Sequence, residues 1–255
     1  MKSSLKNIIL SAFMLMFFVP VFAVTDDEKL WNDAAEAYSQ KNYEEAVTIY
    51  AQLVKKGESP SLYYNYGNAL FKAGYTGRAI LYYERALRLD PSNADIRYNL
   101  DFANLSKTDK IDAIEPFFIT QWYSDITLLF TSNVWAYIAI VLFFLAMVFF
   151  LIYRFGMTLA LRKTGFGLFL LFLACFFISI GHASHSRNMV VDNPAAIVMV
   201  GSETARSTPD MSGTEVFVIH EGTKVFVKSS LGEWIEVRLE DGNVGWIHNS
   251  AVEKI

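Results

Sequence analysis

The side chains best suited to chemistry are two histidines and one cysteine. His182 and His185 are three residues apart, so on a helix they share a face and could hold a metal ion with a third ligand. No third ligand is close to them in the sequence, and Cys175 lies inside an apolar stretch. The chain also lacks a phosphate-binding loop, a nucleophile elbow and an HExxH motif. We therefore expect no enzymatic activity, no metal site and no cofactor.

The histidines end the second of two long apolar stretches. Residues 134–153 and 164–181 carry no charge and are long enough, as helices, to cross a hydrocarbon core. We predict transmembrane helices at 134–153 and 164–183. A pair of buried core helices is the less favoured alternative, because so short a chain has little protein to bury them. Their uncharged interiors disfavour an ion or proton pathway.

The expected loop between the spans, residues 154–163, sets the predicted topology. It carries Arg154, Arg162 and Lys163 and no acid, which is typical of a cytoplasmic loop. Residues 1–23 have the basic start, apolar run and small-residue ending of a signal peptide; an uncleaved anchor helix is the alternative. Either way, both flanking domains are expected outside the cytoplasm.

Charge is distributed unevenly along the chain. Residues 24–115 contain 11 Lys and Arg against 15 Asp and Glu, and residues 188–255 contain 5 against 10. Net negative charge argues against nucleic acid or anionic lipid as the target of these two parts.

An internal repeat organises the N-terminal part. Segments 31–53 and 64–91 share one pattern at a spacing of 33 residues, which is typical of stacked helix pairs. Gly67 and Ala79 are expected to let two helices approach closely. Gly74 suits the left-handed turn between them. A further helix at 93–105 is expected to cover the second pair as a cap.

The second repeat, with Gly67, Gly74, Ala79 and Pro91, resembles the tetratricopeptide repeat. The resemblance implies a domain at 24–108, with two repeats and the capping helix, and a groove that holds a peptide or helix of another protein. For each single groove residue, packing between repeats or plain solvation is the favoured alternative. The candidate groove residues are Trp31, Tyr38, Tyr64, Asn65, Asn68, Phe71, Lys72, Arg97, Tyr98 and Phe102.

Between the repeats and the first span, residues 109–133 form a predicted linker. Its aromatic part, 117–130, is expected to lie on the membrane surface as an amphipathic segment. A single strongly tilted helix that continues into the span is the alternative.

Residues 188–255 change to short alternating apolar segments separated by glycine turns, which predicts a small antiparallel barrel. The Gly245-Trp246 pair after the Asp241-Gly242 turn resembles the bacterial SH3-like domain. Such domains bind peptides or cell-wall fragments. Trp234 and Trp246 are the candidate surface residues, although tryptophans in these positions more often close the barrel.

The fold class expected is thus a multidomain membrane protein: an all-α tetratricopeptide domain, a two-helix transmembrane hairpin and a small all-β SH3-like barrel. This order of parts resembles the BatE family of aerotolerance-operon membrane proteins. The resemblance implies an inner-membrane location with periplasmic end domains, a role in stress tolerance, and partners with von Willebrand A domains or a MoxR-type ATPase. We predict an adaptor that binds proteins; an anchor that binds peptidoglycan is the alternative.

Overall fold

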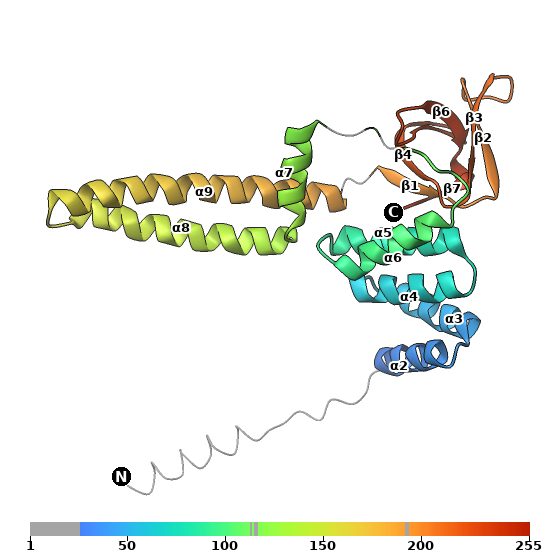
Figure 1. Cartoon of the computed structure of the whole chain (residues 1–255), viewed down its shortest axis with the longest axis horizontal. Coiled ribbons are helices and arrows are strands. Elements are labelled where there is room, and N and C mark those ends of the chain that lie inside the picture. The colour runs from blue at the N-terminus through green and yellow to red at the C-terminus, as the bar shows by residue number, and fades with distance from the viewer. Residues whose placement is uncertain (1–25, 113, 115–116, 192–193) are drawn as a thin grey trace, which may run out of the picture.

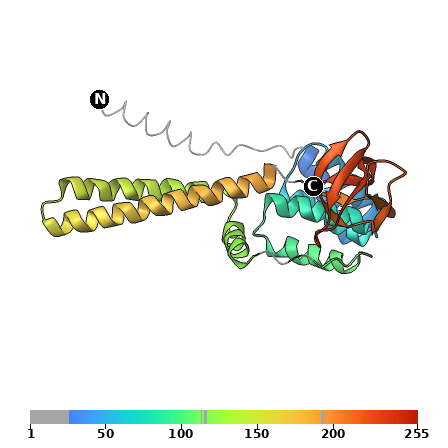
Figure 2. The same cartoon turned by 90° about the horizontal axis from the view of Figure 1, so that it is seen from above.

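The computed structural model describes residues 26–112, 114, 117–191 and 194–255. The predicted signal peptide lies outside these residues. A helical domain and a β domain pack together, and a long helical hairpin extends away from them (Figure 1). Seen from above, the hairpin again points away from the two domains, with α7 at its base (Figure 2).

The helical domain consists of two antiparallel helix pairs and a covering helix. The serine before the second pair and the asparagine before the covering helix cap these helices, because Ser59 accepts from the Leu62 amide and Asn93 from the Ile96 amide. The tetratricopeptide architecture is confirmed. The helices are α2 (Asp26–Ser39), α3 (Tyr43–Val54), α4 (Pro60–Lys72), α5 (Thr76–Leu89) and α6 (Ala94–Leu105).

The turn inside each repeat contains a residue in the left-handed backbone conformation, with positive φ. Gly74 has φ of 93°, and Lys41, 33 residues earlier, has φ of 65°. A lysine in this conformation carries a steric cost that a glycine avoids. The first repeat therefore keeps the geometry of the second despite the poorer residue at its turn.

Gly67 makes space in a different way from the one expected. A Cβ atom on Gly67 would lie 2.7 Å from Cε1 of Tyr83, so the bare glycine accommodates the tyrosine ring rather than a neighbouring backbone. Tyr83 is 2% exposed. The close fit of the two α4 and α5 faces is therefore built around this ring.

The hairpin consists of α8 (Ser132–Phe155) and α9 (Leu159–Val191). Both helices are long and apolar enough to cross a membrane, and only 17% and 11% of their most apolar windows are buried inside the protein. So much exposed apolar surface cannot be stable in water, which supports membrane association. Both helices are longer than the predicted spans, and α9 reaches beyond its apolar part toward the domains (Figure 1).

A separate short helix, α7 (Phe118–Leu128), crosses the base of the hairpin (Figure 1). α7 ends at Leu128 and α8 begins at Ser132, so α7 and α8 are not one continuous tilted helix. Phe118, Ile119 and Trp122 are all more than half exposed. An apolar helix lying across the spans has the orientation of an interfacial segment.

The C-terminal part is a seven-stranded antiparallel sheet, consistent with an SH3-like domain. Its order is β3-β2-β6-β5-β4-β1-β7. The alternation of the sequence did not reveal β2 and β7, which are short and mostly polar. The strands are β1 (Ala195–Val198), β2 (Ser202–Arg206), β3 (Glu215–His220), β4 (Lys224–Leu231), β5 (Trp234–Arg238), β6 (Val244–His248) and β7 (Val252–Lys254).

The two domains share one apolar core. Ala195, Ile197 and Ile255 of the β domain are buried in the same cluster as Ile80 and Leu81 of α5. This joint packing was not foreseen, because an interface between domains has no local sequence pattern. It means that the repeats and the sheet pack together as one unit.

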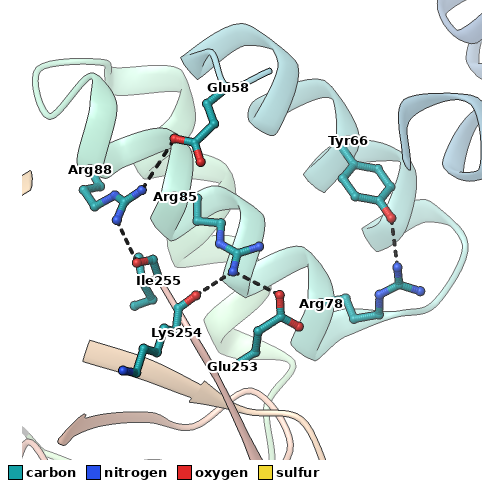
Figure 3. A network of polar contacts seen from close by, with 8 residues as sticks. All are labelled: Glu58, Tyr66, Arg78, Arg85, Arg88, Glu253, Lys254 and Ile255. Atoms are coloured by element: carbon teal, nitrogen blue, oxygen red, sulfur yellow. Dashed lines mark hydrogen bonds and ion pairs between the residues drawn. The ribbon is translucent and has the colours of Figure 1, made fainter. Parts of the chain in front are cut away.

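Two arginines of α5 extend the interface to the last strand (Figure 3). Arg85 donates to the carbonyl oxygen of Lys254 at 2.6 Å and pairs with Glu253 at 3.0 Å. Arg88 donates to the carbonyl oxygen of Ile255 at 2.8 Å. These bonds satisfy backbone acceptors at a sheet edge that would otherwise be open.

A carboxylate in the linker joins the β domain from the other side. Asp109 accepts hydrogen bonds from the backbone amide of His220 and the hydroxyl of Thr223, and lies 2.7 Å from Nδ1 of His220. Burial alone would raise the pKa of Asp109, but these hydrogen bonds outweigh it and hold the pKa below its ordinary value. The ionised carboxylate therefore stabilises the folded state.

We expect Asp109→Asn to lower the free energy of unfolding at pH 7 by about 1–3 kcal/mol, since it removes hydrogen bonds to a charged acceptor. Because the folded-state pKa is depressed, the wild-type contribution is complete above the unfolded value of about 3.9 and is lost as pH falls through the folded value. Thermal unfolding of the full chain in detergent from pH 7 to pH 3 measures both effects.

The matched control is Asp112→Asn, an exposed carboxylate in the same linker. It should leave the unfolding curve unchanged. Equal destabilisation by both variants would mean that linker charge, rather than the Asp109 contacts, matters.

Candidate functional site

The concave side of the repeats holds a cavity of about 320 Å³. It is lined by α2 and α4, the first helices of the two repeats, by the covering helix α6, and by one residue of α5. Its lining combines aromatic side chains, two asparagines and one lysine. The lining residues are Tyr38, Tyr64, Asn68, Phe71, Lys72, Tyr83, Tyr98, Asn99 and Phe102. We call this the repeat groove.

A hydrogen-bond network fixes the floor of the repeat groove. Oδ1 of Asn68 accepts from the Tyr83 hydroxyl and from Nδ2 of Asn99, both at 2.8 Å. Nδ2 of Asn99 also lies 3.0 Å from the Tyr64 hydroxyl. Among the described residues, Nδ2 of Asn68 and Oδ1 of Asn99 have no partner. The floor therefore offers one donor group, the Asn68 NH2, and one acceptor group, the Asn99 carbonyl oxygen, to a ligand.

Burial raises the pKa of Tyr83 and of Tyr38. Burial disfavours the charged phenolate, so both hydroxyls stay protonated at neutral pH. They remain donors, and Tyr83 keeps the Asn68 side chain in one orientation.

The wall formed by α6 is apolar and open to solvent. Tyr98 is 71% exposed and Phe102 is 51% exposed, and the Phe102 ring meets Phe71 edge-on at 5.6 Å. Lys72, also exposed, places a positive charge at the rim. Exposed aromatics beside a few fixed polar groups are typical of a peptide-binding surface.

The structure brings together seven of the predicted groove residues and places three elsewhere. Trp31 packs edge-on against Tyr50 and lines a different cavity. Asn65 does not line the repeat groove, and Arg97 donates to the carbonyl oxygen of Pro91 at 2.7 Å on the side facing the hairpin.

The predicted groove residues did not include Asn99 or Tyr83. Asn99 precedes Phe102 by three residues on α6, so helical spacing places both on the same face of the helix. Its position in the groove could therefore have been predicted from the sequence. The hydrogen bond of Tyr83 to Asn68 joins different helices, which no local pattern reports.

In the β domain, Trp234 and Trp246 lie on one face. Strand pairing sets Trp234 opposite His248 and Trp246 opposite Glu236. The neighbours Ile235 and Ile247 are buried on the other face, so the tryptophans are not part of the buried core of the sheet. Trp234 packs against the His248 ring at 4.0 Å, and both tryptophans are partly exposed.

The histidine pair at the end of the second span has a structural arrangement. His182 is 5% exposed and lies between the rings of Trp135 and Tyr123, at centroid distances of 4.7 and 4.6 Å. Its Nδ1 is 2.7 Å from the hydroxyl of Thr127. His182 therefore joins α7, α8 and α9. Within the described residues, no group of three His, Cys, Asp or Glu side chains could hold a metal ion.

Comparison with known families agrees with the two domain types. Residues 60–93 match the tetratricopeptide repeat, and residues 204–253 match the bacterial SH3 domain. No curated protein matches the chain. Both domain types typically bind other molecules and are not catalytic. The two matches do not extend to the BatE family, so that resemblance remains a prediction.

We expect His182→Ala to release α7 from the hairpin. The variant loses one hydrogen bond and two aromatic contacts, together worth about 2–4 kcal/mol. Amide hydrogen exchange of residues 118–128 in the detergent-solubilised protein should therefore accelerate roughly tenfold or more.

His185→Ala is the matched control, because among the described residues His185 makes a single ring contact, with Tyr123 at 5.3 Å, and no hydrogen bond. Its exchange in α7 should stay within about twofold of wild type. Unchanged exchange in His182→Ala would contradict the role assigned to His182.

Proposed function

We propose that this protein is a membrane-anchored adaptor whose repeat groove binds an extended segment of a partner protein. The observation that carries the proposal is the floor of the repeat groove. There, Nδ2 of Asn68 and Oδ1 of Asn99, which have no partner in the described part of the chain, lie beside an exposed aromatic wall. An extended peptide presents carbonyl acceptors and amide donors in alternation, which these two groups complement.

The remaining groove residues indicate the chemistry of the bound segment. Tyr98 and Phe102 provide apolar area for one or two large side chains. Lys72 favours an acidic residue or a carboxylate near the rim. The expected ligand is therefore an extended segment that combines aromatic or aliphatic side chains with an acid.

The shared core of the two domains makes the adaptor rigid. With Ile197 and Ile255 buried against α5, the repeat groove and the Trp234 face keep a fixed separation. A partner that touches both surfaces then loses less conformational freedom on binding than it would with a flexible tether.

We infer that the anchor is the inner membrane and that both domains face the periplasm. Both lie at one end of the hairpin, away from the basic connection between α8 and α9 (Figure 1). The order of parts further supports the BatE-like assignment. In that setting the partners are von Willebrand A domain membrane proteins and a MoxR-type ATPase complex, acting in aerotolerance or envelope stress.

Site-specific photo-crosslinking in intact cells tests the adaptor proposal. A benzophenone amino acid at Phe102 should capture a partner protein, whereas the same probe at Val216, an exposed position of β3, should not. Lys72→Glu reverses the rim charge without removing a contact among the described residues. It should reduce the yield at Phe102 about three- to tenfold.

Absence of any protein adduct at Phe102 would contradict the adaptor proposal. So would an equal yield from Val216, because the capture would then be unrelated to the repeat groove.

A second candidate function is peptidoglycan binding by the β domain. The exposed faces of Trp234 and Trp246 favour it, because amphipathic aromatic side chains suit ligands that are apolar on one face and polar at the edges. The bacterial SH3 domain match agrees with this candidate.

Co-sedimentation of the detergent-solubilised full chain with purified peptidoglycan tests this candidate. Trp246→Ala should lower the bound fraction about fivefold or more, on the usual cost of losing an aromatic anchor. Trp122→Ala, which removes an exposed tryptophan of α7, should not change it. No binding by the wild-type protein would exclude the candidate and leave the adaptor proposal untouched.

A further inference from the structure

Two adjoining cavities lie between the repeat domain and the base of the hairpin. One, of about 180 Å³, is lined by α5, α6, the turn between them, α7 and α9. The other, of about 300 Å³, is lined by the end of α5, the α5–α6 turn and the ends of α8 and α9. Both are lined by Arg88, Pro91 and Ser186. We call them together the junction cleft.

Three arginines line the junction cleft. Arg88 and Arg97 come from the repeat domain and Arg187 from α9. Among its described lining residues the one acid is Glu84, which is paired with Lys224 through both carboxylate oxygens at 2.9 and 2.8 Å. Arg88 is paired at 3.9 Å with Glu58, which lies outside the lining, so Arg97 and Arg187 provide the excess charge. The cleft therefore carries a net positive charge, although the repeat and β domains are acidic overall.

Arg88 and Arg97 each donate one hydrogen bond to a backbone carbonyl oxygen, of Ile255 and Pro91, and keep further N–H groups for a ligand. Nε of Arg88 is buried and has no hydrogen-bond partner among the described residues. Arg187 is exposed and makes no hydrogen bond or ion pair with another described residue. Buried donors of a charged group are costly to leave unpaired, so an anion in the cleft would stabilise this region.

The lining and the location indicate which anion fits. Thr131, Ser132 and Asn133 place small polar side chains in the larger cavity, and Leu128 and Met189 make part of the smaller one apolar. Its lining includes residues from α7 and from the ends of α8 and α9, and these elements meet at the base of the hairpin (Figure 1). That is the depth at which lipid headgroups meet water.

We propose that the junction cleft binds a phosphate group, supplied by the headgroup of a membrane phospholipid. Guanidinium groups donate paired hydrogen bonds to phosphate oxygens, and Arg88, Arg97 and Arg187 approach the cleft from both sides. The bound lipid connects the repeat domain to α9 and fixes the height of the repeat groove above the membrane.

This site modifies the conclusion drawn from net charge. The overall acidity argued against anionic lipid, but charges separated by more than about 8 Å are screened at physiological ionic strength. Local charge in a partly buried cleft therefore decides binding. The neighbouring cavity, where Arg97 faces Asp101 and Asp125, lacks this positive excess and is not part of the site.

Native mass spectrometry of the delipidated full chain in neutral detergent tests the proposal, with phosphatidylglycerol as the probe. The wild-type protein should retain one lipid in a saturable manner. Arg187→Gln should weaken retention about tenfold, as expected for losing charge-assisted hydrogen bonds. Arg97→Gln combined with Arg187→Gln should weaken it further. Because Arg187 supports no other described contact, its variant should still fold.

Lys163→Gln is the matched control, since it removes one positive charge at the far end of the hairpin. It should change retention less than about twofold. Equal losses in Lys163→Gln and Arg187→Gln, or no saturable lipid, would overturn the proposal. Glycerol phosphate and inorganic phosphate are the competing probes. If either binds as tightly as the lipid and depends equally on Arg187, the phosphate site stands and its source is soluble.

Discussion

The packing of α5 against β1 and β7 is the constraint on which the rest of the structure depends. One face of α5 completes the tetratricopeptide pair through Tyr83, and another buries Ile197 and Ile255 of the β domain. Arg85 and Arg88 close the polar rim of this contact. Because a single helix serves both cores, the repeat groove and the tryptophan face cannot move independently.

The membrane hairpin attaches to this unit through different chemistry. His182, held between Trp135 and Tyr123, joins the two spans to α7 with aromatic contacts and one short hydrogen bond. The domain unit and the hairpin then meet at an arginine-rich boundary, around Arg88 and Arg187. The arrangement keeps apolar contacts in the spans and polar contacts at the level of the headgroups.

Local patterns in the sequence were sufficient for the helices and for most of the strands, although not for β2 and β7. The 33-residue period, the uncharged runs and the glycine turns each encode structure within a short window, and the structure has the corresponding helices and strands. Most of the repeat groove followed from helical spacing, as for Tyr64, Asn68 and Phe71. What a short window reports is which face of an element is apolar.

Local sequence patterns could not predict contacts between segments that are far apart in the chain. The hydrogen bonds of Asp109 to His220 and Thr223 join residues more than 100 positions apart, and nothing near Asp109 in the sequence marks it as special. The same is true of Tyr83 and Asn99 on Asn68, and of Arg97, whose side chain turned to the hairpin instead of the groove. In each case the partner decides the role, and the partner is supplied by the tertiary fold.

The joint core on α5 also has a consequence for biosynthesis. Arg85 and its partner Glu253 are 168 residues apart, so the repeats leave the ribosome long before the strands that cover them. Until then, the face of α5 that packs on the β domain stays exposed while the apolar helices α8 and α9 are inserted into the membrane. That exposed apolar surface makes the nascent repeats prone to aggregation until the last strand packs on α5.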